Sequence, residues 1–112
     1  MAALTPITVT SGLTTATPLS VSASDTVAID TGLLTLLFQG GAGSDTITIT
    51  DAGLTPGGSA ASATAITVAL SSGATNFKVV KVPSAWQNSS GVVTITHSAP
   101  TGVVCFPFKY YL

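Results

Sequence analysis

Threonine and isoleucine alternate without interruption along Thr46-Ile47-Thr48-Ile49-Thr50, which is the clearest strand pattern in the chain. Successive side chains of a β-strand point to opposite faces, so such a stretch has one apolar face and one hydroxyl face. The same alternation of residue types occurs in Thr8-Val9-Thr10, in residues 66–70 and in residues 93–96. Threonine and β-branched apolar residues suit a pleated, half-buried surface, while Glu and Arg, both good helix formers, are absent. The pattern predicts an all-β protein.

Turn-forming residues divide the chain into short segments. Residues 40–45 are typical of a hairpin loop, residues 55–62 form a longer loop of small residues, and residues 83–91 fit one helical turn. The spacing predicts a single-domain antiparallel β-sandwich over residues 1–112, Ig-like or jelly-roll-like, with residues 1–15 as an N-terminal arm or first strand. The predicted strands lie near residues 6–11, 19–22, 25–30, 33–39, 45–51, 64–70, 75–82, 91–98 and 102–111.

The last predicted strand has two unlike faces. Val104, Phe106, Phe108 and Tyr110 share one of them. Pro107, on the other, has no N–H to donate to a neighbouring strand, so we expect this strand at a sheet edge or bent there. An exposed edge with aromatic residues invites pairing with another chain.

Charge is scarce in this chain. Charged residues make up 6% of the sequence, with four Asp, three Lys and a net charge of −1, against about 25% in an ordinary soluble domain. A lone soluble monomer usually carries mixed surface charge. We therefore expect a surface that is covered by other copies of the chain or by a larger assembly.

The same composition excludes several classes of partner. No basic patch exists for nucleic acid, and no polybasic stretch exists for an anionic membrane. The longest apolar run, residues 33–38, is far too short to span a bilayer. Residues 1–6 lack the basic and apolar blocks of a secretory signal, so we expect none.

Few residues are suited to catalysis. His97 is the single histidine, and we expect it at a sheet margin, bonded to backbone or water. Cys105, the single cysteine, has no partner for a disulfide and sits in an apolar strand, as buried free cysteines do. Paired aspartates suit glycoside hydrolysis, but such enzymes normally have several aromatic platforms. The sequence predicts a protein without catalytic residues or a cofactor.

One metal motif is present. Residues 40–48 match the calcium-binding nonapeptide G-G-x-G-x-D-x-U-x, with Asp45 as its acid. Such sites hold each ion between stacked repeats, and a single copy has too few oxygens for six to eight ligands. The hairpin interpretation is preferred, and a calcium ion at the Asp45 loop stays an open alternative.

The order of strands and turns along the chain resembles that of a known protein family. Asp25-Thr26-Val27 leads into the apolar strand 34–38, a Gly/Ser turn opens Thr46-Ile47-Thr48-Ile49, and Gly91 to Ser98 closes into Thr101-Gly102-Val103-Val104. Over roughly residues 24–106 this resembles small tailed-bacteriophage structural proteins of the capsid decoration (cement) type. The chain departs from their pattern at Gln39-Gly40-Gly41, at His97 and in the tail 106–112.

The resemblance implies a non-enzymatic component of the virion. It would sit on the capsid surface after assembly in the host cytoplasm, bind the major capsid protein, and stabilise the shell by bridging its subunits. We also expect self-association, as a trimer. The residues predicted to make these contacts are Leu4, Ile7, Trp86, Tyr110 and Tyr111.

Alternatives remain at this stage. Trp86 either closes one end of the core or anchors a subunit contact, where tryptophan is over-represented. Another virion part, such as a head–tail connector, tail tube or fibre module, fits the same patterns. A small adhesin or carbohydrate-binding module would use Trp86 and Tyr110 or Tyr111 as a sugar platform.

Overall fold

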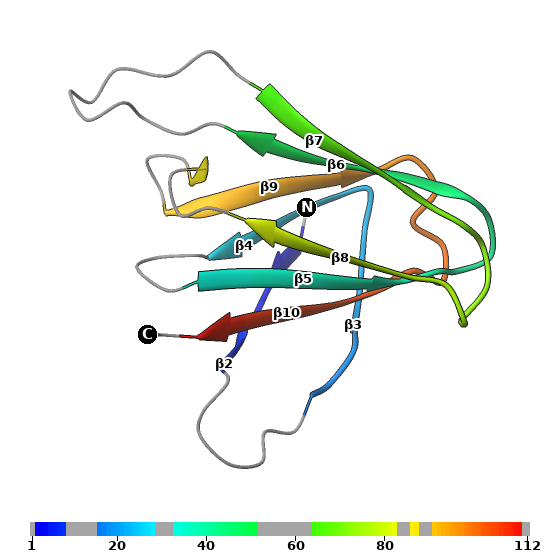
Figure 1. Cartoon of the computed structure of the whole chain (residues 1–112), viewed down its shortest axis with the longest axis horizontal. Coiled ribbons are helices and arrows are strands. Elements are labelled where there is room, and N and C mark those ends of the chain that lie inside the picture. Colours follow the sequence, from blue (N-terminus) through cyan, green and yellow to red (C-terminus); the bar gives the residue numbers. More distant parts are fainter. Residues whose placement is uncertain are drawn as a thin grey trace.

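The chain folds into two facing β-sheets (Figure 1). The computed structural model describes residues 2–8, 16–28, 33–51, 64–82, 86–87 and 91–110. Within these ranges no helix is long and apolar enough to cross a membrane. The strands are β1 (Ala2–Leu4), β2 (Ile7–Thr8), β3 (Leu19–Ser20), β4 (Ser24–Ala28), β5 (Leu33–Gln39), β6 (Asp45–Asp51), β7 (Thr64–Leu70), β8 (Phe77–Val82), β9 (Val92–His97) and β10 (Val104–Tyr110).

The strand order is that of a jelly roll. Sheet A runs β1-β4-β9-β6-β7, and sheet B runs β2-β10-β5-β8 with β3 also paired to β10. From the middle of the chain outward, β6 pairs with β7, β5 with β8, β4 with β9 and β3 with β10, all antiparallel. A long hairpin folded into two sheets has this connectivity. The predicted all-β sandwich is confirmed, and the strand order selects the jelly roll over the Ig-like arrangement.

The predicted hairpin at residues 40–45 is wrong. The strands on either side of it, β5 and β6, belong to different sheets and do not pair with each other. The segment is a corner that carries the chain from sheet B to sheet A. Turn residues mark the break between two strands, but they do not tell whether the second strand returns beside the first or crosses to the facing sheet.

The N-terminal segment is divided between the sheets. Its first strand, β1, lies before the strand predicted near residues 6–11; it is parallel to β4, with Leu4 opposite Val27. The second, β2, lies parallel to β10, with Ile7 opposite Phe108. Both sheets are therefore mixed, and the predicted antiparallel arrangement holds for the other pairs. Residues 9–15, part of the predicted arm, lie outside the described residues.

The predicted edge position of the last strand is also wrong. β10 lies inside sheet B, paired with β5 along its whole length and with β2 and β3 on its other side. On that second side, β3 pairs with Val104 and Cys105, and β2 pairs with Phe108 and Lys109. Pro107 falls in the gap between them. An internal strand accepts a proline here because its flanking partner is interrupted at that residue.

The core between the sheets follows the alternation read from the sequence. In β6, Ile47 and Ile49 are fully buried, whereas Thr46 is exposed. Leu36, Phe38 and Cys105 of sheet B meet them at zero exposure. Each large apolar side chain buried in this way contributes about 1.5–3 kcal/mol. The expected burial of Cys105 is confirmed.

The two outer faces differ in chemistry. Sheet A presents hydroxyls in rows across its strands, with Ser24, Thr96, Thr48 and Thr67 in one row and Thr26, Thr94 and Thr50 in the next. The outer face of sheet B groups apolar side chains instead, with Gln39, Thr35 and Lys81 beside them. Because both hydroxyl-bearing and apolar β-branched residues are good strand formers, the strand pattern permits either face.

Candidate functional site

Four connections between the sheets meet at one end of the sandwich, which we call the loop end: residues 21–23, 40–44, 71–76 and 98–103 (Figure 1, right). Backbone hydrogen bonds tie them together. The N–H of Gly40 donates to the Asn76 carbonyl at 2.8 Å, and that of Gly73 to the Gly41 carbonyl at 2.9 Å. The N–H of Ala42 donates to the Thr101 carbonyl at 3.0 Å. The loop end is a hydrogen-bonded cap on the sandwich.

Gly40 and Gly41 make this closure possible. A Cβ on Gly40 would lie 2.3 Å from the backbone oxygen of Ser71, and one on Gly41 would lie 2.4 Å from that of Thr101. Gly43, in the same connection, has nothing within 4 Å of its added Cβ. The first two glycines of the nonapeptide are thus required by close backbone approach.

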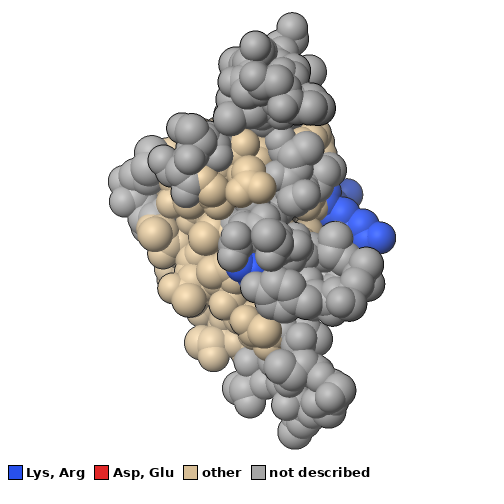
Figure 2. All heavy atoms as spheres, turned by 90° about the vertical axis from the view of Figure 1, so that its left-hand side faces the viewer, with Lys and Arg blue, Asp and Glu red and all other residues tan. Residues whose placement is uncertain are grey.

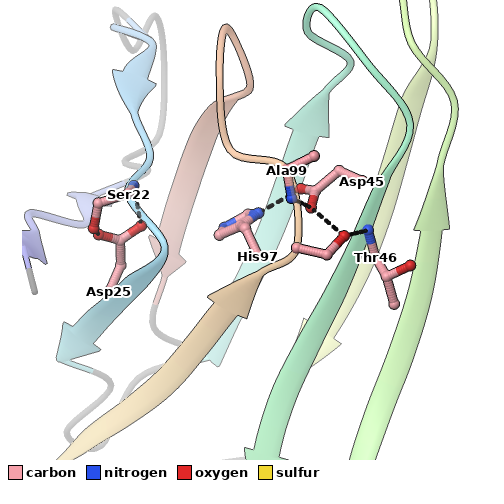
Figure 3. Close-up of polar contacts among 7 residues, drawn as sticks. Ser22, Asp25, Asp45, Thr46, His97 and Ala99 are labelled. Carbon is pink, nitrogen blue, oxygen red and sulfur yellow. Dashed lines mark hydrogen bonds and ion pairs between the residues drawn. The ribbon is translucent and has the colours of Figure 1, made fainter.

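A buried ionisable pair lies beneath this cap (Figure 3). Nδ1 of His97, at the end of β9, is 2.6 Å from Oδ2 of Asp45, at the start of β6. The other carboxylate oxygen accepts the Ala99 backbone N–H at 3.0 Å and faces the Ser98 hydroxyl at 3.4 Å. Both side chains of the pair are fully inaccessible to solvent. The Asp45 carboxylate thereby holds the 98–103 connection to β6.

His97 is held from two further sides. Its backbone N–H donates to the Ala23 carbonyl at 2.9 Å, and its ring meets the Phe38 ring edge-on at a centroid distance of 5.7 Å. Phe38 belongs to sheet B, so the histidine contacts both sheets. His97 lies at the end of β9, as expected, but the expected partner is wrong: the side chain binds a carboxylate rather than backbone or water, and the residue as a whole is only 6% exposed.

The pair does not form an accessible catalytic centre. In an Asp–His–nucleophile arrangement, the second ring nitrogen must reach the nucleophile. Nε2 of His97 is buried without a hydrogen-bond partner among the described residues. Ser98 faces the carboxylate, and its hydroxyl accepts the Thr46 N–H at 2.8 Å. The geometry supports a structural role in fastening the loop end.

A second buried aspartate lies on the neighbouring strand. Asp25 of β4 is fully buried and accepts the Ser22 backbone N–H at 2.9 Å; the Ser22 hydroxyl also donates to it (Figure 3). Burial, assisted by the Asp25 carboxylate, raises the pKa of the Cys105 thiol from 9.0 to about 12. Since the thiolate is the reactive form, this cysteine is inert in the folded chain.

Among the described residues, no group of three or more His, Cys, Asp or Glu side chains is arranged to hold a metal ion. Both oxygens of Asp45, the acid of the nonapeptide, are already engaged by His97 and Ala99. Its carboxylate points into the sandwich, whereas the calcium motif needs it in the turn.

The accessible candidate for function is the outer face of sheet B. Phe77 is 50% exposed and Val79 is 65% exposed, both on β8. Phe106 and Phe108 of β10 lie nearly parallel, with ring centroids 6.2 Å apart. Leu37 connects the two strands, because it stands opposite Phe106 on one side and Val79 on the other. We call Ile7, Leu37, Phe77, Val79, Phe106 and Phe108 the apolar face.

The structure places four of the predicted contact residues in different surroundings. Ile7 is half-buried and stands opposite Phe108, so it extends the apolar face. Leu4 lies in the core at 6% exposure, and the apolar face omits it. Trp86 is partly buried and packs against the core. Tyr110 ends β10 opposite Leu33, and the fifth residue, Tyr111, lies outside the described residues.

Sequence reasoning missed the exposed pair on β8 and the Asp45–His97 pair. The second had a detectable signal: Asp45 and Ile47 share one strand face, as do His97 and Ile95. The sequence does not show that β6 pairs with β9. This pairing, in which Ile47 stands opposite His97, brings the histidine close to Asp45.

The lysines and aspartates are distributed unequally. Lys78 and Lys81 on β8 are exposed, and Lys109 is on β10, so all three lysines belong to sheet B. Asp25 and Asp45, the aspartates whose side chains are described, are both buried in sheet A. Figure 2 accordingly shows lysine and no acidic side chain among the described residues on the side that it draws.

Comparisons with known proteins found no match to the chain among family models, curated proteins or solved structures.

Proposed function

We propose that this chain is a capsid decoration (cement) protein of a tailed bacteriophage, a non-enzymatic component that binds the outer surface of the shell and bridges its subunits. The observation that carries the proposal is the apolar face of sheet B. Phe77 and Val79 are exposed there and the other apolar side chains are half-buried, and a contiguous apolar surface of this kind is typical of interaction sites. The sequence resemblance supplies the class of partner, the major capsid protein.

The fold is compatible with this role. Jelly rolls are frequent in viral capsid proteins and also in lectins, so the architecture supports the proposal only by analogy. The contrast between the two outer faces adds a physical argument. A decoration protein needs one adhesive surface and one surface that tolerates water, and the hydroxyl rows of sheet A suit the second requirement.

The chemistry of the apolar face defines the surface that it fits. Its aromatic and aliphatic groups gain free energy by leaving water, at roughly 25 cal/mol per Å² of apolar area. Lys81 lies beside them, since it stands opposite Thr35, which stands opposite Phe108. The complementary patch on the capsid protein is therefore apolar with acidic groups at its border.

Stabilisation of the shell follows from mass action. A ligand that binds the assembled shell and not its dissociated subunits raises the free energy needed to take the shell apart. Repetition over a symmetric lattice turns modest contacts into a large total effect. The buried His97 and Cys105 have no part in this function, which needs no catalytic group.

The test uses shells of the phage that encodes the chain, prepared without this protein. Wild-type protein added back is expected to bind at many copies per shell and to raise the temperature at which the shells open. Val79→Asp is expected to weaken binding at least tenfold, because it places an acid in the apolar face. Thr48→Asp, on the outer face of sheet A, is the matched control and is expected to bind within about twofold of wild type. Absence of the chain from shells and virions, or equal effects of the two substitutions, would refute the proposal.

A further inference from the structure

Two strand edges lie on the same side of the sandwich. β7 ends sheet A with β6 as its described neighbour, and β8 ends sheet B with β5 as its described neighbour. The connection 71–76 joins them at the loop end, and both edges face the upper side of the view in Figure 1. An edge strand presents unpaired backbone N–H and C=O groups, to which another strand adds readily unless side chains prevent it.

The two edges differ in protection. β8 carries Lys78 and Lys81, both exposed, and lysine on an edge is a common device against strand addition. β7 is seven residues long and contains no charged residue, no proline and no glycine. At the opposite edge of sheet A, β1 has only three residues. Of the described edges, β7 is the long unprotected one.

We propose that β7 is a self-association edge, at which two copies of this chain pair antiparallel about a twofold axis through Thr67. In this register Ile66 stands opposite Val68 of the second copy, and Thr67 stands opposite its own equivalent. The register keeps core-side residues opposite core-side residues, because Ile66, Val68 and Leu70 face the core whereas Thr67 and Ala69 are exposed. A register centred between two residues would place core-side positions opposite outer ones.

The side chains at this edge favour the pairing. Ile66 and Val68 are only partly buried within one copy, where they pack against the rim of the core. Pairing covers the remainder of both side chains and joins the two copies of sheet A into one continuous sheet. Thr67 is exposed, and a Thr–Thr pair is a favourable cross-strand contact. The exposed Lys78 and Lys81 of β8 would instead bring positive charges from both copies to one interface, so sheet B does not join in the same way.

This inference replaces the trimer expected from the sequence with a twofold dimer, and it does not depend on binding to a capsid. Sedimentation equilibrium of the purified chain is expected to show a reversible dimer at micromolar concentration. Thr67→Lys places two positive charges opposite each other and is expected to weaken dimerisation at least tenfold. Thr94→Lys, the same substitution on the outer face of sheet A but on the inner strand β9, is the matched control and is expected to leave the dimer unchanged. A dilute thermal melt checks that both variants fold.

Disulfide trapping tests the register directly. Directly opposed Cα atoms in an antiparallel pair lie about 4.5–5.5 Å apart, within the range that a disulfide spans. Thr67→Cys is therefore expected to form a covalent dimer under mild oxidation. Ala69→Cys is expected not to, because the two residues 69 would be offset by four positions, about 13 Å along the strands. A strict monomer at high micromolar concentration, a trimer, or equal trapping at the two positions would overturn the inference.

Discussion

Nδ1 of His97 and Oδ2 of Asp45 lie 2.6 Å apart in a site that water does not reach, and they join β9 to β6 beneath the loop end. The two residues are 52 positions apart in the chain, so the contact exists only once both strands have taken their places in sheet A. One oxygen of the Asp45 carboxylate binds the His97 ring, and the other accepts the backbone N–H of Ala99 in the 98–103 connection. Removal of either partner therefore has consequences beyond one hydrogen bond.

We expect Asp45→Ala to lower the free energy of unfolding by about 3–5 kcal/mol, because it leaves the buried His97 ring and the partly buried Ala99 N–H without an acceptor. His97→Ala and the double variant complete a cycle measured by urea denaturation. The two losses are expected to be non-additive by about 0.5–3 kcal/mol, as for residues in direct contact. Strict additivity would show that the pair is not an energetic unit.

The glycines of the corner 40–44 supply a matched pair of substitutions. Gly41→Ala is expected to lower stability by about 1–3 kcal/mol or more, because the new Cβ would overlap the backbone of residues 101–103. Gly43→Ala meets nothing within 4 Å and is expected to change stability by less than about 1 kcal/mol. Thermal unfolding of the two variants side by side measures the difference, and similar melting temperatures would contradict it.

Val79 and Val80 are adjacent on β8, with exposures of 65% and 9%. Val80→Thr buries a hydroxyl and is expected to cost about 1–3 kcal/mol. Val79→Thr is expected to alter stability by less than about 0.5 kcal/mol. Denaturation midpoints distinguish the two. A large loss for Val79→Thr would mean that the apolar face is already covered within the chain.

The Cys105 thiol gives the protein a defined alkaline response. Its folded-state pKa of about 12 lies above the ordinary 9.0, so below pH 9 the thiol is protonated in both folded and unfolded chains and stability is unaffected. Above pH 9 the unfolded chain loses this proton while the folded chain keeps it. Stability is therefore expected to fall by about 1.4 kcal/mol per pH unit as the pH rises towards 12.

The control for this response is Cys105→Ala, which removes the titrating group. Its stability is expected to be lower at neutral pH but to decline less steeply between pH 9 and 12 than that of wild type. A thiol reagent is expected to label wild-type protein only after unfolding. Equal alkaline slopes, or rapid labelling of the folded chain, would show that the thiol is not buried in solution.

Much of the fold was predictable from alternation alone. The predicted strands at 33–39, 45–51 and 64–70 coincide with β5, β6 and β7, because β-branched and apolar residues at every second position specify both a strand and its buried face. β1, of three residues, is too short for any period to appear, and it is defined only by its pairing with β4. Pro107 predicts an edge strand because it has no N–H to donate, and the interruption between β2 and β3 that accommodates it inside the sheet is invisible in the sequence.

The candidate interaction surfaces were likewise predictable from the sequence only in part. The amino-acid sequence establishes which residues alternate, how little charge the chain carries, and that Phe106 and Phe108 share a face. The three-dimensional arrangement was needed to show that this face points outward next to Val79, that His97 meets Asp45, and that the uncharged strand β7 forms an edge. The difference arises because side-chain alternation is a local property of the backbone. Which strand lies beside which is decided by the packing of the two sheets against each other, through contacts between residues far apart in the chain.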